Sequence, residues 1–78
     1  MTRLPRASGR NVLRALLHAD FELSHIRGSH HYLRSSSGGG LVVVPVHGNR
    51  DLPDGTMRSV LRQSGLTTEQ LADLLHGR

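Results

Sequence analysis

Apolar residues recur at three- and four-residue intervals in three stretches of the chain, the spacing typical of helices with one buried face. The first covers residues 8–19, where Ser8 is suited to cap the helix N-terminus. The second covers residues 54–64, with Asp54 as the predicted N-cap and a glycine directly after its end. The third begins after Thr67, which a glutamine follows three residues later, as in a capping box. One helix is therefore expected near the start of the chain and two near its end.

Two stretches between the first and second helices have contrasting strand patterns. Residues 21–26 begin with alternating side chains, which suits a short, half-buried strand. One face of this strand is predicted to carry Phe21, Leu23 and His25. Residues 41–46 are almost wholly apolar and rich in valine, so they are predicted to form a well-covered strand whose pairing stops near Pro45.

A further strand is predicted over residues 29–35, where side chains alternate between two faces. If Leu33 faces the core, His31 lies on the same face of the strand. The opposite, outward face then consists of His30, Tyr32 and Arg34.

The order helix, three strands, helix, helix predicts an α+β fold with a three-stranded antiparallel sheet, because short connections join the strands. The first two helices are expected on one sheet face, which leaves the other face for a partner. All 78 residues are assigned to one domain. Residues 1–7 are expected to be a flexible tail, and the serine- and glycine-rich residues 35–40 a flexible hairpin loop.

The charge of the chain narrows the choice of partner. It has ten arginines and no lysine against six acidic residues, which gives a formal net charge of +4. Arginine binds phosphate through two parallel hydrogen bonds, so a polyanion such as nucleic acid is favoured.

The absence of cysteine excludes a disulfide framework and a thiol nucleophile. No stretch approaches the roughly 20 apolar residues of a membrane span, so a cytoplasmic protein is expected.

The turn before the second predicted strand holds the strongest candidate for chemistry. An imidazole titrates near neutral pH, so His30 can take a proton from a hydroxyl group. Gly28 and Ser29 are small and leave the backbone accessible to a phosphodiester. RNA carries its own nucleophile, the 2′-hydroxyl, so a protein that cleaves it needs only a base and positive charge near the phosphate.

Positive and aromatic residues around His30 are candidates for binding RNA. Arg27 is expected to support the phosphate because it lies beside the turn. Tyr32 and Arg34 share the outward face with His30, where a ring can stack on a base and a guanidinium can contact phosphate.

The other chemical interpretations are weaker. A metal site would need several ligands to converge, whereas His30 and His31 are predicted to point to opposite faces. His25 and His47 are interpreted as ordinary polar residues near strand ends. No Gly-x-Ser-x-Gly elbow is present for a serine hydrolase, and the acidic residues resemble surface or capping residues rather than a catalytic pair.

Three segments together resemble the HicA family of toxin RNA interferases. They are Arg27-Gly28-Ser29-His30-His31-Tyr32-Leu33, Val42-Val43-Val44-Pro45-Val46-His47, and the run from Asp51 through Gly55-Thr56-Met57 to Gly65-Leu66. Any one of them is a weak signal, but their order and spacing agree from about residue 10 to residue 75.

This resemblance implies a fold similar to the double-stranded-RNA-binding domain and an mRNA-cleaving activity that requires no metal or other cofactor. It also implies a cognate HicB antitoxin that covers the active site. The family's catalytic histidine corresponds to His30 and its turn glycine to Gly28. His31 falls at a position where the family has other residues, so no catalytic role is carried onto it.

The chain departs from the family pattern at three positions. Arg27 stands where a lysine is usual, which keeps the charge but changes the hydrogen-bond geometry. Asp20 stands where many members have glycine, and an aspartate tolerates the left-handed backbone that such a position favours. Leu33 replaces an aromatic residue and keeps an apolar contact.

The sequence thus favours a toxin that cleaves mRNA, with His30 as general base and single-stranded RNA as substrate. Two alternatives use the same face of the same fold. One is an RNA-binding module without catalytic activity, and the other is a protein whose outward sheet face serves only to dock an antitoxin.

Overall fold

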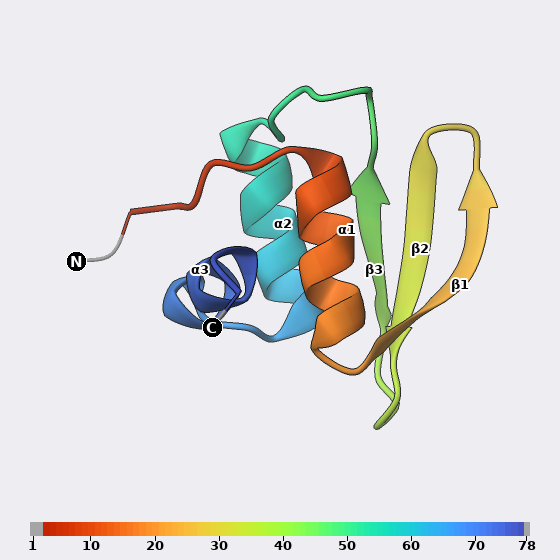
Figure 1. The fold of residues 1–78 in the computed structure, drawn as a ribbon. Helices are drawn as coiled ribbons and strands as arrows, with labels where there is room; N and C mark the ends of the chain where they lie inside the picture. The colour runs from red at the N-terminus through yellow and green to blue at the C-terminus, as the bar shows by residue number, and fades with distance from the viewer. Residues whose placement is uncertain (1–2, 78) are drawn as a thin grey trace.

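The computed structural model describes residues 3–77, which form three helices and three strands (Figure 1). The elements in chain order are α1 (Gly9–His18), β1 (Phe21–Arg27), β2 (His30–Ser35), β3 (Leu41–Pro45), α2 (Asp54–Ser64) and α3 (Thr68–Leu75). The strands form one antiparallel sheet with β2 in the centre. The predicted order of elements is confirmed, and the architecture fits an α+β fold like that of the double-stranded-RNA-binding domain.

Helices cover one face of the sheet. α2 packs on β3, α1 contacts both β3 and β1, and α3 packs on α1 (Figure 1). β1 lies at the edge farther from α2, and its first residue, Phe21, is its only buried one. The helical cover is therefore concentrated over the β3 half of the sheet.

The core is built from apolar residues of both layers. Its largest fully buried side chains are Leu16, Leu33, Met57, Leu71, Val12, Val42, Val44 and Val60. β3 supplies two of them because its inner face meets the helices, which confirms that residues 41–46 contain a well-covered strand. Strand pairing ends at Pro45, as predicted. On the free edge of β3, the Val43 amide donates a hydrogen bond to the side-chain oxygen of Gln63 at 2.9 Å.

Several helix ends follow the predicted capping chemistry. The Ser8 hydroxyl accepts a hydrogen bond from the Asn11 amide at 3.1 Å and so caps α1. Thr67 and Gln70 form both hydrogen bonds of a capping box at the start of α3. Gly65 ends α2 in the left-handed conformation, with φ +74°.

The predicted N-cap of α2 is wrong by one residue. Pro53, not Asp54, has the extended backbone of an N-cap, and its carbonyl accepts a hydrogen bond from the Met57 amide at 2.9 Å. No side chain caps this helix. Asp54 is instead the first helical residue, where a carboxylate is favoured by the positive end of the helix dipole.

The predicted faces of β1 are also wrong in part. The register between β1 and β2 shifts between Leu23 and His25, so Ser24 is the extra residue of a β-bulge. Beyond the bulge the alternation is reversed, and His25 pairs with Tyr32 instead of sharing the inner face with Leu23. Alternation counted along one strand cannot detect a residue that has no cross-strand partner.

The segment before α1 crosses the helical layer and is tied to the loop before α2. Ala7 is buried, and its carbonyl accepts a hydrogen bond from the Leu52 amide at 2.9 Å. Leu4 packs against the core. Flexibility of residues 1–7 stays a prediction, and Met1 and Thr2 lie outside the described residues. Flexibility of the loop at residues 35–40 also stays a prediction.

Candidate functional site

A two-residue turn joins β1 to β2 and opens the candidate site. Gly28 has φ +55°, a conformation that residues with a β-carbon rarely adopt. A β-carbon built at Gly28 would meet no atom within 4 Å, so the backbone angle rather than crowding requires glycine. The backbone at Gly28 is therefore open to solvent, as expected for a surface that a bulky anion approaches.

His30 begins β2 on the sheet face opposite the helices. It pairs with Arg27 of β1 on one side and with Pro45 of β3 on the other. The side chain is exposed, and within residues 3–77 its ring forms no hydrogen bond or ion pair. Both ring nitrogens are therefore available to a substrate, and the residue paired with His30 on β1, Arg27, is a cation.

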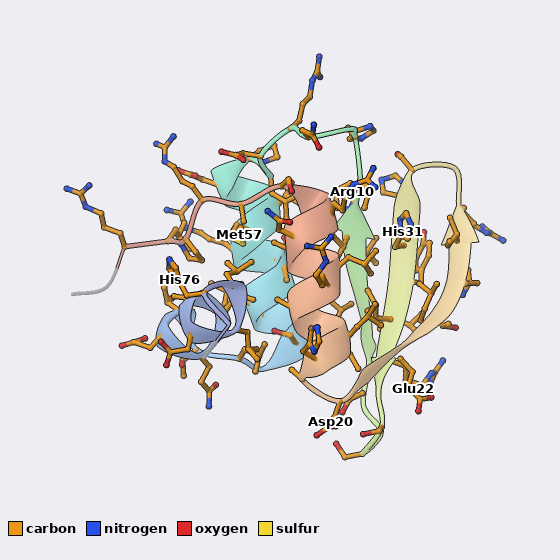
Figure 2. All side chains as sticks on the ribbon, viewed as in Figure 1. Arg10, Asp20, Glu22, His31, Met57 and His76 are labelled. Atoms are coloured by element: carbon orange, nitrogen blue, oxygen red, sulfur yellow. The ribbon has the colours of Figure 1, made fainter. Side chains whose placement is uncertain are left out.

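His31 lies on the other face of the same strand (Figure 2). Its cross-strand neighbours are Val44, which is fully buried, and Ile26. The ring is half-buried, and its Nδ1 lies 3.4 Å from the carbonyl oxygen of Ser29. The prediction that strand alternation separates the two neighbouring imidazoles is confirmed.

The outward face also holds an aromatic pair that strand alternation did not predict. The rings of His25 and Tyr32 are stacked, with centroids 4.3 Å apart and planes 7° from parallel. The hydroxyl of Ser24 forms a 3.0 Å hydrogen bond with Nδ1 of His25 and helps to hold this ring. The β-bulge at Ser24 is the cause, because it turns His25 to the Tyr32 side.

A second imidazole reaches the turn from the end of β3. Nε2 of His47 lies 3.4 Å from the hydroxyl of Ser29, and the Val46 amide donates a 2.8 Å hydrogen bond to the Ser29 carbonyl. Our interpretation of His47 as an ordinary polar residue overlooked this proximity. The signal was present in the sequence, because an antiparallel β2–β3 pair brings the residues after Pro45 beside those before His30.

The predicted site residues do not all gather at one point. Arg27, Gly28 and Ser29 adjoin His30, whereas Arg34 lies four residues farther along β2, or roughly 13 Å at the rise of a strand. The cross-strand partner of Arg34 is Glu22, an opposite charge that moderates its field. Arg34 therefore belongs to a different part of the sheet face from His30.

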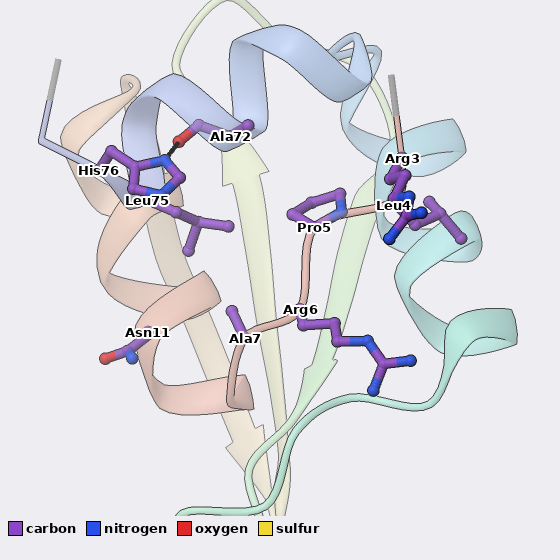
Figure 3. A pocket seen from close by; sticks show the side chains of 9 residues that line it. All are labelled: Arg3, Leu4, Pro5, Arg6, Ala7, Asn11, Ala72, Leu75 and His76. Atoms are coloured by element: carbon purple, nitrogen blue, oxygen red, sulfur yellow. Dashed lines mark hydrogen bonds between the residues drawn. The ribbon is translucent and has the colours of Figure 1, made fainter. Parts of the chain in front are cut away.

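A surface hollow of about 450 Å³ lies elsewhere, between the N-terminal segment and α3 (Figure 3). Leu4, Asn11 and Leu75 are among its lining residues, and none of the predicted site residues lines it. The candidate site is instead the open sheet end, which suits an extended polymer better than an enclosed small molecule.

Among residues 3–77, no three His, Cys, Asp or Glu side chains come close enough to hold a metal ion. In the same residues, no helix is both long and apolar enough to cross a membrane.

Comparison with known proteins places the chain in a family. The family model described as the HicA toxin of bacterial toxin-antitoxin matches residues 9–66 of the 78. The match runs from α1 through α2 and includes the Gly28–His30 turn and His47. No curated protein matched the chain. Because the match covers more than half of the sequence, the chain belongs to the HicA family and is the toxin of a toxin–antitoxin system.

Proposed function

We propose that this toxin is an endoribonuclease in which His30 is the general base. The single observation that carries the proposal is the exposed, unpartnered ring of His30 beside the open glycine turn. Family membership supports a toxic activity, and the excess of arginine supports a polyanionic substrate.

In this mechanism the scissile phosphate lies at the turn between β1 and β2. His30 removes the proton from the neighbouring 2′-hydroxyl, whose oxygen then attacks phosphorus. Arg27 and the backbone amides of Gly28 and Ser29 stabilise the negative charge that builds up on the phosphate oxygens. A cofactor is not invoked, because the nucleophile belongs to the substrate and the base to the protein.

The outward sheet face gives the RNA a path away from the turn. A base can stack on the paired rings of His25 and Tyr32, since base–aromatic stacking tolerates any sequence. Arg34 lies beyond them and is placed for the phosphate of another nucleotide, not for the scissile one. This arrangement fits single-stranded mRNA, whose bases are free to unstack.

The partner of the toxin follows from the same site. We propose a HicB-like antitoxin that inhibits the toxin by covering His30 and the turn. The exposed residues of this sheet end offer such a partner direct access to the catalytic group. Both proteins are expected to act in the cytoplasm, where mRNA is found.

The test is the variant His30→Ala, assayed for growth inhibition on expression and for cleavage of purified RNA. Because the His30 side chain is exposed and forms no hydrogen bond or ion pair within residues 3–77, we expect the loss of both activities with almost no change in Tm. The matched control is His18→Ala, which removes an exposed imidazole at the far end of α1 and should remain active.

Two results would contradict the proposal. Cleavage by His30→Ala at the parental rate would reject His30 as the base. Salt-dependent RNA binding by the parent protein, without cleavage at any protein excess, would instead favour a binding module on the same face.

A further inference from the structure

We infer that His47 is the general acid that protonates the leaving oxygen when the RNA chain is cut. The inference rests on the proposed function, because it completes the reaction that His30 begins. It assigns a catalytic role to a residue that lies outside β2 and 17 positions after His30 in the chain.

The backbone carries His47 to the turn that precedes His30. His30 of β2 pairs with Pro45 of β3. The hydrogen bond from the Val46 amide to the Ser29 carbonyl extends the contact between these two segments by one residue. Val46 packs against the core on the inner face. The next residue, His47, follows the end of the strand, and its ring lies beside the hydroxyl of Ser29, the residue directly before His30.

The two imidazoles adjoin the same turn, where the scissile phosphate of the proposed mechanism lies. His47 stands two positions after Pro45, the partner of His30, and diagonal residues across paired strands have α-carbons roughly 7–8 Å apart, within reach of long and aromatic side chains. The hydroxyl of Ser29, 3.4 Å from Nε2 of His47, helps to orient that ring toward the turn.

The reaction needs a second group because attacking and leaving oxygens lie on opposite sides of phosphorus. As the 2′-oxygen bonds to phosphorus, the bond from phosphorus to the 5′-oxygen breaks and its electron pair stays on that oxygen. The His47 imidazolium donates its proton there, which yields a 2′,3′-cyclic phosphate and a 5′-hydroxyl. His30 ends protonated and His47 neutral, and exchange with water restores both.

Other groups near the turn are poorer proton donors. A guanidinium such as that of Arg27 stabilises charge but is a poor proton donor. His31 lies on the inner face, and the Tyr32 ring is stacked against His25. Besides His30, the imidazole left beside the turn to donate the proton is that of His47.

The test compares two substrates of identical sequence, an ordinary RNA oligonucleotide and one with sulfur in place of the 5′-oxygen at the cleaved bond. A thiolate leaves without protonation, so the second substrate does not need a general acid. We expect His47→Ala to cleave ordinary RNA about 10²–10⁴-fold more slowly than the parent and the sulfur-containing RNA at nearly the parental rate. His30→Ala should remain impaired on both.

The outcomes separate the roles that His47 could have. If His47→Ala lost cleavage rate equally on the two substrates, His47 would only shape the site. If its rate on ordinary RNA were unchanged, His47 would have no role. Either result overturns the inference. Failure of the parent to cleave either substrate would overturn the proposed function itself. The matched control Asn49→Ala changes an exposed residue of the same loop and should leave both rates and Tm unaltered.

Discussion

Leu23 and Leu33 face each other across β1 and β2, yet their surroundings differ sharply. Leu33 is fully buried, whereas Leu23 is 44% exposed. The helices cover the sheet over β3 and part of β2, and β1 extends beyond them (Figure 1). The β3 half of the sheet is therefore part of the core, while the end of the β1–β2 hairpin is left exposed to solvent.

The largest expected effect is the loss of stability in Leu33→Ala, compared with the same truncation at Leu23. Leu33→Ala should lower the free energy of unfolding by about 2–5 kcal/mol, because it leaves a cavity in the core. Leu23→Ala should change it by less than about 1 kcal/mol, because much of this residue is already exposed to water in the folded state. Urea unfolding monitored by circular dichroism measures both, and equal losses would refute the division into two halves.

A smaller effect is expected where α1 meets the end of β3. A β-carbon at Gly9 would collide with the carbonyl oxygen of Pro45 and lie 3.2 Å from the α-carbon of Val46. Gly9→Ala should therefore cost about 1–3 kcal/mol, since backbone must move to relieve the clash.

The matched control for this change is Gly55→Ala in α2, where a β-carbon meets no atom within 4 Å. It should raise stability by about 0.5–1 kcal/mol, because alanine loses less backbone entropy in a helix. Thermal unfolding distinguishes the two, and a stabilised Gly9→Ala protein would show that the helix and strand do not pack as tightly as described.

The smallest effect is expected at Asp20, where the chain passes from the helical layer into the hairpin. Asp20 has φ +65°, which confirms that an aspartate accepts the left-handed backbone at this position. Asp20→Gly should stabilise the protein by about 0.5 kcal/mol, and Asp20→Ala should destabilise it by a similar amount. Melting temperatures that move in the opposite order would contradict this account of the junction.

Features decided by neighbouring residues were predictable from the sequence. The apolar run of β3, the Ser8 cap and the Thr67 capping box all depend on contacts within a few residues. The outward position of His30 was also predictable, because the extra residue of the bulge lies in β1 and β2 itself alternates without interruption from His30 to Arg34.

Features decided by pairing between distant segments were not predictable in the same way. The place of His25 depends on an extra residue that only the partner strand reveals. The approach of His47 to Ser29 depends on where β3 ends relative to the turn. The N-cap of α2 was missed because proline at position 53 can take the cap conformation without a capping side chain.

Neither free edge of the sheet presents an unbroken row of backbone groups with which another strand could pair. At the β3 edge, the Val43 amide is occupied by Gln63 and Pro45 has no amide hydrogen to donate. At the β1 edge, the bulge at Ser24 interrupts the regular row of backbone groups. Copies of this small toxin therefore have no continuous strand through which to join, and we expect it to resist edge-to-edge aggregation even when it accumulates to high concentration.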